Sequence, residues 1–224
     1  GCHYLKGKIT KGGEYISTQF HFFFYCLYRL NEDVSMKRNH LIYLKIIELL
    51  KDGAFNRSSG YHTFVFSSLS LKEVQSRYVV LRDFIEKNHN LIFFTDKRSP
   101  KVKSIIKNNR TECLFYDRIE KIQLRIRTKS FILRDNQEIR KYWDKVPLES
   151  RKPYSTKLAP SSTLDTENIG SQEAFLSDEN VFSNFCVVEN YIREVDFLSL
   201  ISDSHKRLKI IIENNQIKIK ELTP

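Results

Sequence analysis

Residues 91–109 read LIFFTDKRSPKVKSIIKNN, an apolar run that gives way to a polar turn and then to a segment crowded with cations. The apolar run, over residues 90–95, is typical of a strand because it is short, aromatic and followed by turn residues. Ser99 is a favoured helix N-cap, and Pro100 suits the first helical position, where its missing N–H costs nothing. Apolar residues then recur at helical spacing over residues 102–106. The stretch therefore predicts a strand, a tight turn and a short helix that ends near residues 108–109.

Further strand-like segments flank this turn on both sides. In one of them, apolar Ile122, Leu124 and Ile126 alternate with polar residues, as expected for a strand with two different faces. Helices are predicted at residues 39–51, from an apolar stripe, and at residues 137–145. The predicted strands are residues 61–69, 76–84, 90–95, 111–116, 121–133, 185–200, 207–212 and 216–222. Two groups of strands with helices between them predict a mainly β protein with peripheral helices (α+β), built as an antiparallel barrel.

The composition indicates a soluble globular protein with an anionic partner. The 224 residues are 41% hydrophobic, which is ample for a packed core, and no apolar stretch reaches the roughly 18 residues that span a bilayer. The formal net charge of +10 favours nucleic acid, a membrane surface or a phosphorylated ligand, although most of the lysines are expected to be solvated. The four cysteines and six histidines are dispersed, so no metal site is expected, and reduced thiols suit a cytoplasmic protein.

The ends of the predicted domain are set by changes in composition. Residues 1–35 contain basic residues and the aromatic run FHFFFYCLYRL, and Met36 is the only methionine. We therefore expect residues 1–35 to be an accessory or non-native N-terminal extension and residues 36–224 to form the domain. Residues 147–180 are polar and rich in Pro, Ser and Thr, which predicts a long loop.

The cations around the turn have two interpretations. A helix N-terminus presents unpaired N–H groups that suit a phosphate oxygen, and Arg98 and Lys101 are placed to neutralise a dianion. On this segment alone, a capped surface helix with solvated lysines is favoured. Other cationic segments are RYVVLR (77–82), QLRIR (123–127) and SHKRLKI (204–210). Strict alternation sends the two arginines of the first segment to opposite faces, and it places the polar residues of the second on one face.

Taken in order, the motifs RYVVLR, FFT, SPK, IQLRIR and HKR resemble those of the FMN-binding split barrel of the pyridoxamine 5′-phosphate oxidase family. The family pattern is an Arg-x-Val-Leu-Leu-Lys strand, a Phe-Tyr-Thr strand end, a Ser-Arg-Lys turn into a helix, a Gln-rich strand and a C-terminal Arg-x-His-x-Arg strand. The resemblance extends over roughly residues 40–224. It implies an antiparallel split β-barrel of the FMN-binding type, an oxidoreductase that transfers a hydride or electrons at the flavin, and a homodimer with the flavin at the subunit interface.

The resemblance also implies a role for each matching position. Arg77 and Lys101 would bind the FMN phosphate, with Ser99 at the helix start. Gln123 would hydrogen-bond the flavin, and Arg207 would approach the ring from the partner subunit. The residues that would border the ring and the ribityl chain are Val80, Leu81, Arg82, Phe94 and Thr95.

Several departures from the family pattern indicate a divergent branch that retains FMN. Pro100 replaces the middle arginine of the Ser-Arg-Lys turn, Arg82 stands where the oxidase has a lysine, and Asp203 stands where it has an active-site arginine. The substrate is expected to be pyridoxamine phosphate or another small molecule, and no catalytic residue is assigned. The candidate substrate-binding residues are Arg82, Tyr142, Arg151 and His205.

Two alternatives stay open. The first is a non-catalytic FMN- or haem-binding split-barrel protein that acts as carrier or sensor, with His205 as a candidate axial ligand. The second is a nucleic-acid-binding barrel that uses the +10 charge and surface aromatics. The second is less favoured because the basic residues are scattered along the chain and the aromatic residues lie mainly in core-like runs.

Overall fold

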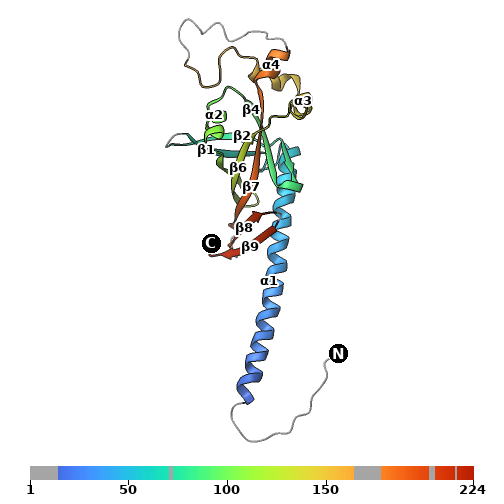
Figure 1. The fold of residues 1–224 in the computed structure, drawn as a ribbon. Helices are drawn as coiled ribbons and strands as arrows, with labels where there is room; N and C mark the ends of the chain where they lie inside the picture. Colours follow the sequence, from blue (N-terminus) through green and yellow to red (C-terminus); the bar gives the residue numbers. More distant parts are fainter. Residues whose placement is uncertain (1–14, 71–72, 164–177, 202–204, 215) are drawn as a thin grey trace. The chain divides into compact units, whose positions relative to one another are not determined.

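The strands of this protein form one antiparallel sheet. The computed structural model describes residues 15–70, 73–163, 178–201, 205–214 and 216–224 (Figure 1). Within them the strand order is β2-β1-β5-β6-β7-β4-β3, and β8 pairs with β7 and with β9. The strands are β1 (Thr63–Ser70), β2 (Glu73–Val80), β3 (Asp83–Ile85), β4 (Asn90–Asp96), β5 (Arg110–Asp117), β6 (Ile122–Ile132), β7 (Phe185–Ser199), β8 (Lys206–Glu213) and β9 (Gln216–Leu222).

Helices lie outside this sheet. The α-helices are α1 (Tyr15–Phe55), α2 (Pro100–Lys107), α3 (Asn136–Asp144) and α4 (Asp178–Asn184), and the 3-10 helices are η1 (Glu86–Asn88) and η2 (Leu148–Tyr154). The predicted fold class, a mainly β and antiparallel split barrel with peripheral helices, is confirmed.

The long strand β7 is the point at which the barrel splits. On one side, residues Val188 to Ser199 of β7 pair with β6. On the other side its first half pairs with β4, up to Tyr191, and its second half pairs with β8, from Glu194 onward. Figure 1 shows β4 beside the upper part of β7 and β8 beside its lower part. The change of partner falls at Ile192 and Arg193, where the register with β6 also shifts.

Aromatic side chains fill the inside of the barrel. Phe64 and Phe66 of β1 and Phe115 of β5 are at most 1% exposed, because strand alternation turns them all to the same face. The ring of Phe66 lies 4.8 Å from that of Phe93 in β4, and the rings of Phe64 and Phe115 stack at 4.7 Å. Rings at these distances add to the hydrophobic gain of burial. This inner face fixes which strand residues point into the barrel.

A second core lies on the opposite face of β4 and β7. Trp143 of α3 is fully buried there, with its ring 5.0 Å from Phe185 and 5.8 Å from Tyr154. Arg151 donates to the backbone carbonyls of Trp143 and Val146, at 3.1 and 3.0 Å, and thereby holds η2 against α3. The prediction that residues 147–180 form a plain loop is therefore wrong for residues 148–154, and residues 164–177 lie outside the described part of the chain.

The chain divides into two compact units, Gly1–Ile42 and Tyr43–Pro224, and α1 contributes to both. The predicted helix at residues 39–51 is present, but the helix begins at Tyr15, because no Gly or Pro interrupts the sequence between Gly13 and Gly53. It also passes the expected stop at Gly53, against which the backbone of Tyr61 packs so closely that a Cβ would not fit. The proposed boundary at residues 35/36 falls inside this helix, and the division stays a prediction.

Two other expectations need correction. The predicted strand 76–84 is broken, because the backbone N–H of Leu81 donates to His62 O and that of Arg82 donates to Ile92 O, both at 2.8 Å. The chain thus changes its hydrogen-bonding partner from the segment before β1 to β4. Leu81 and Arg82 thereby connect β2 and β3, the first and last strands of the order β2-β1-β5-β6-β7-β4-β3. His205, expected on the last strands, precedes β8. Among the residues described, no helix has the length and apolarity to cross a membrane.

Candidate functional site

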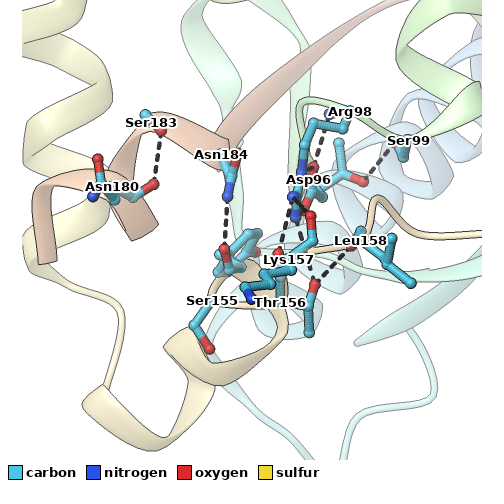
Figure 2. A network of polar contacts seen from close by, with 12 residues as sticks. Asp96, Arg98, Ser99, Ser155, Thr156, Lys157, Leu158, Asn180, Ser183 and Asn184 are labelled. Atoms are coloured by element: carbon cyan, nitrogen blue, oxygen red, sulfur yellow. Dashed lines mark hydrogen bonds and ion pairs between the residues drawn. The ribbon is translucent and has the colours of Figure 1, made fainter. Parts of the chain in front are cut away.

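The turn after β4 is fixed by Asp96, whose side chain is 5% exposed. Its Oδ1 accepts hydrogen bonds from the backbone N–H and the Nε of Arg98, at 2.7 and 3.0 Å, and its Oδ2 accepts one from Nη2 at 2.7 Å (Figure 2). This pairing raises the pKa of Arg98. A guanidinium held by both carboxylate oxygens is already neutralised. Arg98 is therefore engaged by Asp96, which differs from the hypothesis that it neutralises a dianion.

Arg98 also ties this turn to the segment after η2. Its Nη1 donates to the carbonyl oxygens of Thr156 and Lys157, at 2.9 and 3.1 Å (Figure 2). Beside them, Asn184 Nδ2 donates to Tyr154 O at 2.9 Å. The start of the long connection between α3 and β7 is thus held against the β4–α2 turn.

Behind the turn, four polar side chains meet on the inner face of the barrel. Lys101 of α2 donates from Nζ to Thr95 Oγ1 at 3.0 Å, and Ser99 Oγ lies 3.4 Å from the same oxygen. Arg77 of β2 points to this face too, because it is paired with Phe66 in the β1–β2 register, and its Nη1 donates to Ser68 Oγ at 2.7 Å. We call Arg77, Thr95, Ser99 and Lys101 the inner cluster.

The inner cluster contains two cations, Arg77 and Lys101, whose charges are not paired with a carboxylate in an ion pair among the described residues. Burial lowers the pKa of Lys101, and the positive charge of Arg77 lowers it further, whereas the negative charge of Asp96 acts in the opposite direction. Burial likewise lowers the pKa of Arg77. Within the described residues, neither cation forms an ion pair. Cys186, which is paired with Thr95 across β4 and β7, has a pKa raised by burial to about 12 and so stays a neutral thiol at pH 7.

Ser99 begins α2 without capping it in the usual way. Its backbone is extended, with φ −64° and ψ 147°, and Pro100 follows at the first helical position, as predicted. However, its hydroxyl makes no side-chain hydrogen bond to the helix N–H groups. Ser99 is fully buried, and its hydroxyl lies in the inner cluster beside Thr95 Oγ1.

Arg82 and Phe94, predicted to border the ring and ribityl chain, lie on the other face of β4. The guanidinium of Arg82 is 5.8 Å from the ring centroid of Phe94, which packs against the second core, with Tyr142 at 5.5 Å. Val80 is half-buried at the end of β2, and Leu81 is fully buried. Thr95 is the one member of this predicted set that joins the inner cluster.

Gln123 and Arg207 lie on the outer face of the sheet. Gln123 of β6 pairs with Leu198 of β7, and Leu198 pairs in turn with Arg207 of β8. The three residues therefore lie side by side across the sheet. Arg207 donates from Nε and Nη2 to the two oxygens of Asp196, at 3.0 and 2.9 Å, and Arg125 donates to Asp196 Oδ2 at 2.6 Å. The hydrogen bond from Arg207 is the main reason why the pKa of Asp196 is lowered. We call Arg125, Asp196 and Arg207 the outer triad.

The structure therefore brings some predicted site residues together and separates others. Arg77, Thr95, Ser99 and Lys101 share one locus, whereas Gln123 and Arg207 share a row on the opposite face of the same sheet. Within a single chain these two groups do not surround one cavity.

The candidate substrate-binding residues are dispersed. Tyr142 and Arg151 pack in the second core, where burial raises the pKa of Tyr142 to about 12. His205 is exposed ahead of β8. Sequence reasoning missed Asp196 and Ser68, the partners of Arg207 and Arg77. Both occupy alternating strand positions that carry no motif, so only the strand register identifies them.

Comparisons with known proteins agree with this fold. Residues 46–134 match the family model described as pyridoxamine 5′-phosphate oxidase, FMN-binding domain. A pyridoxamine 5′-phosphate oxidase-related, FMN-binding protein from Nostoc punctiforme superposes with a TM-score of 0.62 at 16% identity, covering 80% of this chain and 96% of that one. PhzG from Burkholderia lata superposes with a TM-score of 0.56 at 15% identity, covering 86% of this chain and 92% of that one. No curated protein matches the sequence.

The strand order and the similar solved structures together define an antiparallel split-barrel fold. Residues 46–134 are thus similar to the FMN-binding domain of the pyridoxamine 5′-phosphate oxidase family, the family that the sequence motifs resemble. The matched segment contains every member of the inner cluster as well as Gln123, and it ends before the strand that carries Arg207.

Proposed function

We propose that this protein binds FMN and that the inner cluster holds the FMN phosphate. The observation that carries the proposal is the pair of partly buried cations on the inner face of the barrel, Arg77 and Lys101, neither of which forms an ion pair among the described residues. A phosphate dianion supplies the missing charge, and the hydroxyls of Thr95 and Ser99 add hydrogen-bond donors. The residue types therefore fit the terminal phosphate of the cofactor.

FMN supplies hydride and single-electron transfer when it is bound. The residues of this chain bind and orient the cofactor. Arg98 does so indirectly, because it holds the β4–α2 turn in place through Asp96. The buried floor of the inner cluster, formed by the aromatic side chains of the barrel, keeps water from the phosphate contacts.

A homodimer would bring the two separated groups of residues to one flavin. Gln123 and Arg207 lie on the outer face, where they can reach a ring held by the partner subunit. Size-exclusion chromatography with light scattering should give a dimer. Arg207→Ala should weaken FMN binding less than Arg77→Ala, because Arg207 is already paired with Asp196. A strict monomer that binds FMN tightly would contradict the dimeric arrangement.

The binding test is a flavin titration followed by fluorescence quenching. The purified protein should be yellow or become yellow with added FMN. Arg77→Ala should raise the dissociation constant on the order of 10- to 100-fold, the usual effect of losing a charge-assisted contact. Arg118→Ala, an exposed arginine on the β5–β6 turn, is the matched control and should change nothing. A protein that neither contains FMN nor shows a thermal shift with it would overturn the proposal.

We propose further that the bound flavin oxidises a small molecule, with pyridoxamine 5′-phosphate as the first compound to assay. The measurement is hydrogen peroxide release in air by the FMN-loaded protein. Release that depends on the added amine would support an oxidase. FMN binding without turnover of pyridoxamine or pyridoxine phosphate would favour the carrier alternative.

A further inference from the structure

A second positively charged site lies at the rim of the barrel, away from the inner cluster. A groove of about 610 Å³ runs over the ends of β1, β5 and β6 and the middle of β7. Its cationic side chains are Arg110, Arg127, Lys129 and Arg193, and its apolar wall is formed by Leu69 and Val74. We call it the rim groove.

The strand register explains why these cations gather. Arg110 and Lys129 are paired across β5 and β6, so their side chains share one face. Arg127 points to the same face two residues earlier on β6. Arg193 is the extra residue of a bulge in β7, because Arg127 is paired with Glu194 and Thr128 with Ile192. Bulges re-aim side chains and are frequent beside functional sites.

Glu112 is the acidic residue among the described lining residues, and most of the cations form no ion pair within the part of the chain that the structure describes. Arg127 lies 3.9 Å from a carboxylate oxygen of Glu112 and 3.4 Å from one of Glu194, and it is 58% exposed. For the other three cations, Arg110, Lys129 and Arg193, no ion pair exists among the residues that the structure describes. Like charges that converge without a partner repel one another, and an anion with several charges removes that repulsion.

The apolar wall indicates which kind of anion fits. Val74 is 71% exposed, and Leu69 is its partner in the β1–β2 register, so an apolar pair faces the groove beside the cations. Ser67 of the same strand also lines the groove, on the face that carries Leu69, whereas the hydroxyl of Ser68 points to the inner face and accepts from Arg77. The lining therefore offers an apolar contact, a hydroxyl and cations.

We propose that the rim groove binds a nucleoside polyphosphate, with the phosphoryl groups on Arg110, Lys129 and Arg193 and the base against Leu69 and Val74. A nucleic-acid strand is less suited to the groove, because none of the described residues that line it has an aromatic side chain on which bases could stack. Ser68 lines the groove and also accepts the hydrogen bond from Arg77, so the groove adjoins the inner cluster without sharing its cations.

Isothermal titration calorimetry of the full-length protein, saturated with FMN, tests the proposal with ADP as the probe. ADP should bind, and Arg193→Ala and Lys129→Ala should each weaken it on the order of tenfold, as expected for lost contacts to a phosphate. Arg118→Ala and Lys218→Ala remove exposed cations of the same types outside the groove and should leave the affinity unchanged. Pyrophosphate, which has no base, should bind several-fold more weakly than ADP.

Other results would overturn the proposal. The first is a titration with ADP that gives no heat of binding. The second is an ADP affinity that is the same in Arg193→Ala, in Lys129→Ala and in the unchanged protein. The third is pyrophosphate binding as tight as that of ADP. Tighter binding of a single-stranded oligonucleotide than of ADP would assign the groove to nucleic acid instead. The flavin titration is run on the same variants. Arg193→Ala should leave FMN affinity intact, and a loss of both ligands would mean that the groove is part of the flavin site.

Discussion

The inner cluster and the outer triad use the same kind of side chain in opposite ways. Both contain cations, and they lie on the two faces of one sheet, with Lys101 contributed by the helix α2. In the outer triad, Asp196 neutralises Arg125 and Arg207 through three hydrogen bonds of 2.6–3.0 Å. In the inner cluster, Arg77 and Lys101 donate to the hydroxyls of Ser68 and Thr95 and form no ion pair among the described residues. The first arrangement stabilises the fold, whereas the second costs stability until an anion arrives.

The largest expected effect is on the outer triad. Asp196→Ala should lower the free energy of unfolding by about 2–3 kcal/mol, because it leaves two guanidiniums without their shared partner. The cost is below that of a fully buried pair, since Arg125 and Arg207 are 40% and 31% exposed. Urea denaturation measures the change. Asp144→Ala, at an exposed carboxylate, should stay within about 0.5 kcal/mol, and equal effects of the two substitutions would break the contrast.

The inner cluster should respond with the opposite sign. Lys101→Met removes a partly buried charge and keeps most of the apolar stem, so the FMN-free protein should gain about 1 kcal/mol of stability. The same substitution should weaken FMN binding on the order of tenfold or more. Lys103→Met, on the exposed side of the same helix, should change neither quantity. A destabilised Lys101→Met protein would show that the cation supports the fold rather than a ligand.

The two regions should also differ in their pH dependence. The pKa of Asp196 is lowered from its ordinary value of 3.8, mainly by the hydrogen bond from Arg207. Its stabilising contribution is therefore fully present above pH 3.8 and is lost as the pH falls through the lowered value. Asp196→Asn should flatten this acid limb of the stability curve. Acid titration followed by circular dichroism measures it, and an unchanged limb would contradict the assignment.

For Lys101 the lowered pKa acts at alkaline pH. Below its folded pKa the charged amine destabilises the native state, and this penalty is relieved as the pH rises toward the ordinary value of 10.5. Stability measured without FMN should therefore rise less with pH in Lys101→Met than in the unchanged protein over this range. Lys103→Met is again the control. If the free energy of unfolding rises with pH by the same amount in the unchanged protein and in Lys101→Met, the charged form of Lys101 does not destabilise the folded state.

The difference between the two regions also marks what the sequence could and could not predict. Local patterns found the β4–α2 turn, the alternation that puts Gln123 and Arg125 on one face, and most strand positions, because these depend on neighbouring residues. Neither the pairing of Arg207 with Asp196 nor that of Arg98 with Asp96 was foreseen. Both carboxylates lie inside apolar strands, and their partners are set by register and turn geometry.

The same reasoning explains the other errors. Residues 148–154 form a 3-10 helix because Arg151 and Tyr154 pack against Trp143, a contact between separate segments that polar composition hides. The opposite placement of Arg77 and Gln123 follows from the β1–β2 and β5–β6 registers. The sequence therefore shows which residues are cationic. It does not show which of these cations pair with a carboxylate in the folded protein.

The smallest expected effect separates a ligand-binding hydroxyl from a helix cap. At α3, Asp135 caps the helix by accepting from the N–H groups of Gln137 and Glu138, at 2.9 and 3.0 Å, so Asp135→Ala should cost about 1 kcal/mol of stability. At α2, Ser99 makes no such bond, so Ser99→Ala should cost less than about 0.5 kcal/mol. Ser99→Ala should nevertheless weaken FMN binding several-fold, because the hydroxyl beside Thr95 is lost. Urea denaturation and flavin titration of the two variants separate the roles, and a Ser99→Ala protein that loses stability but keeps its FMN affinity would make Ser99 an ordinary structural residue.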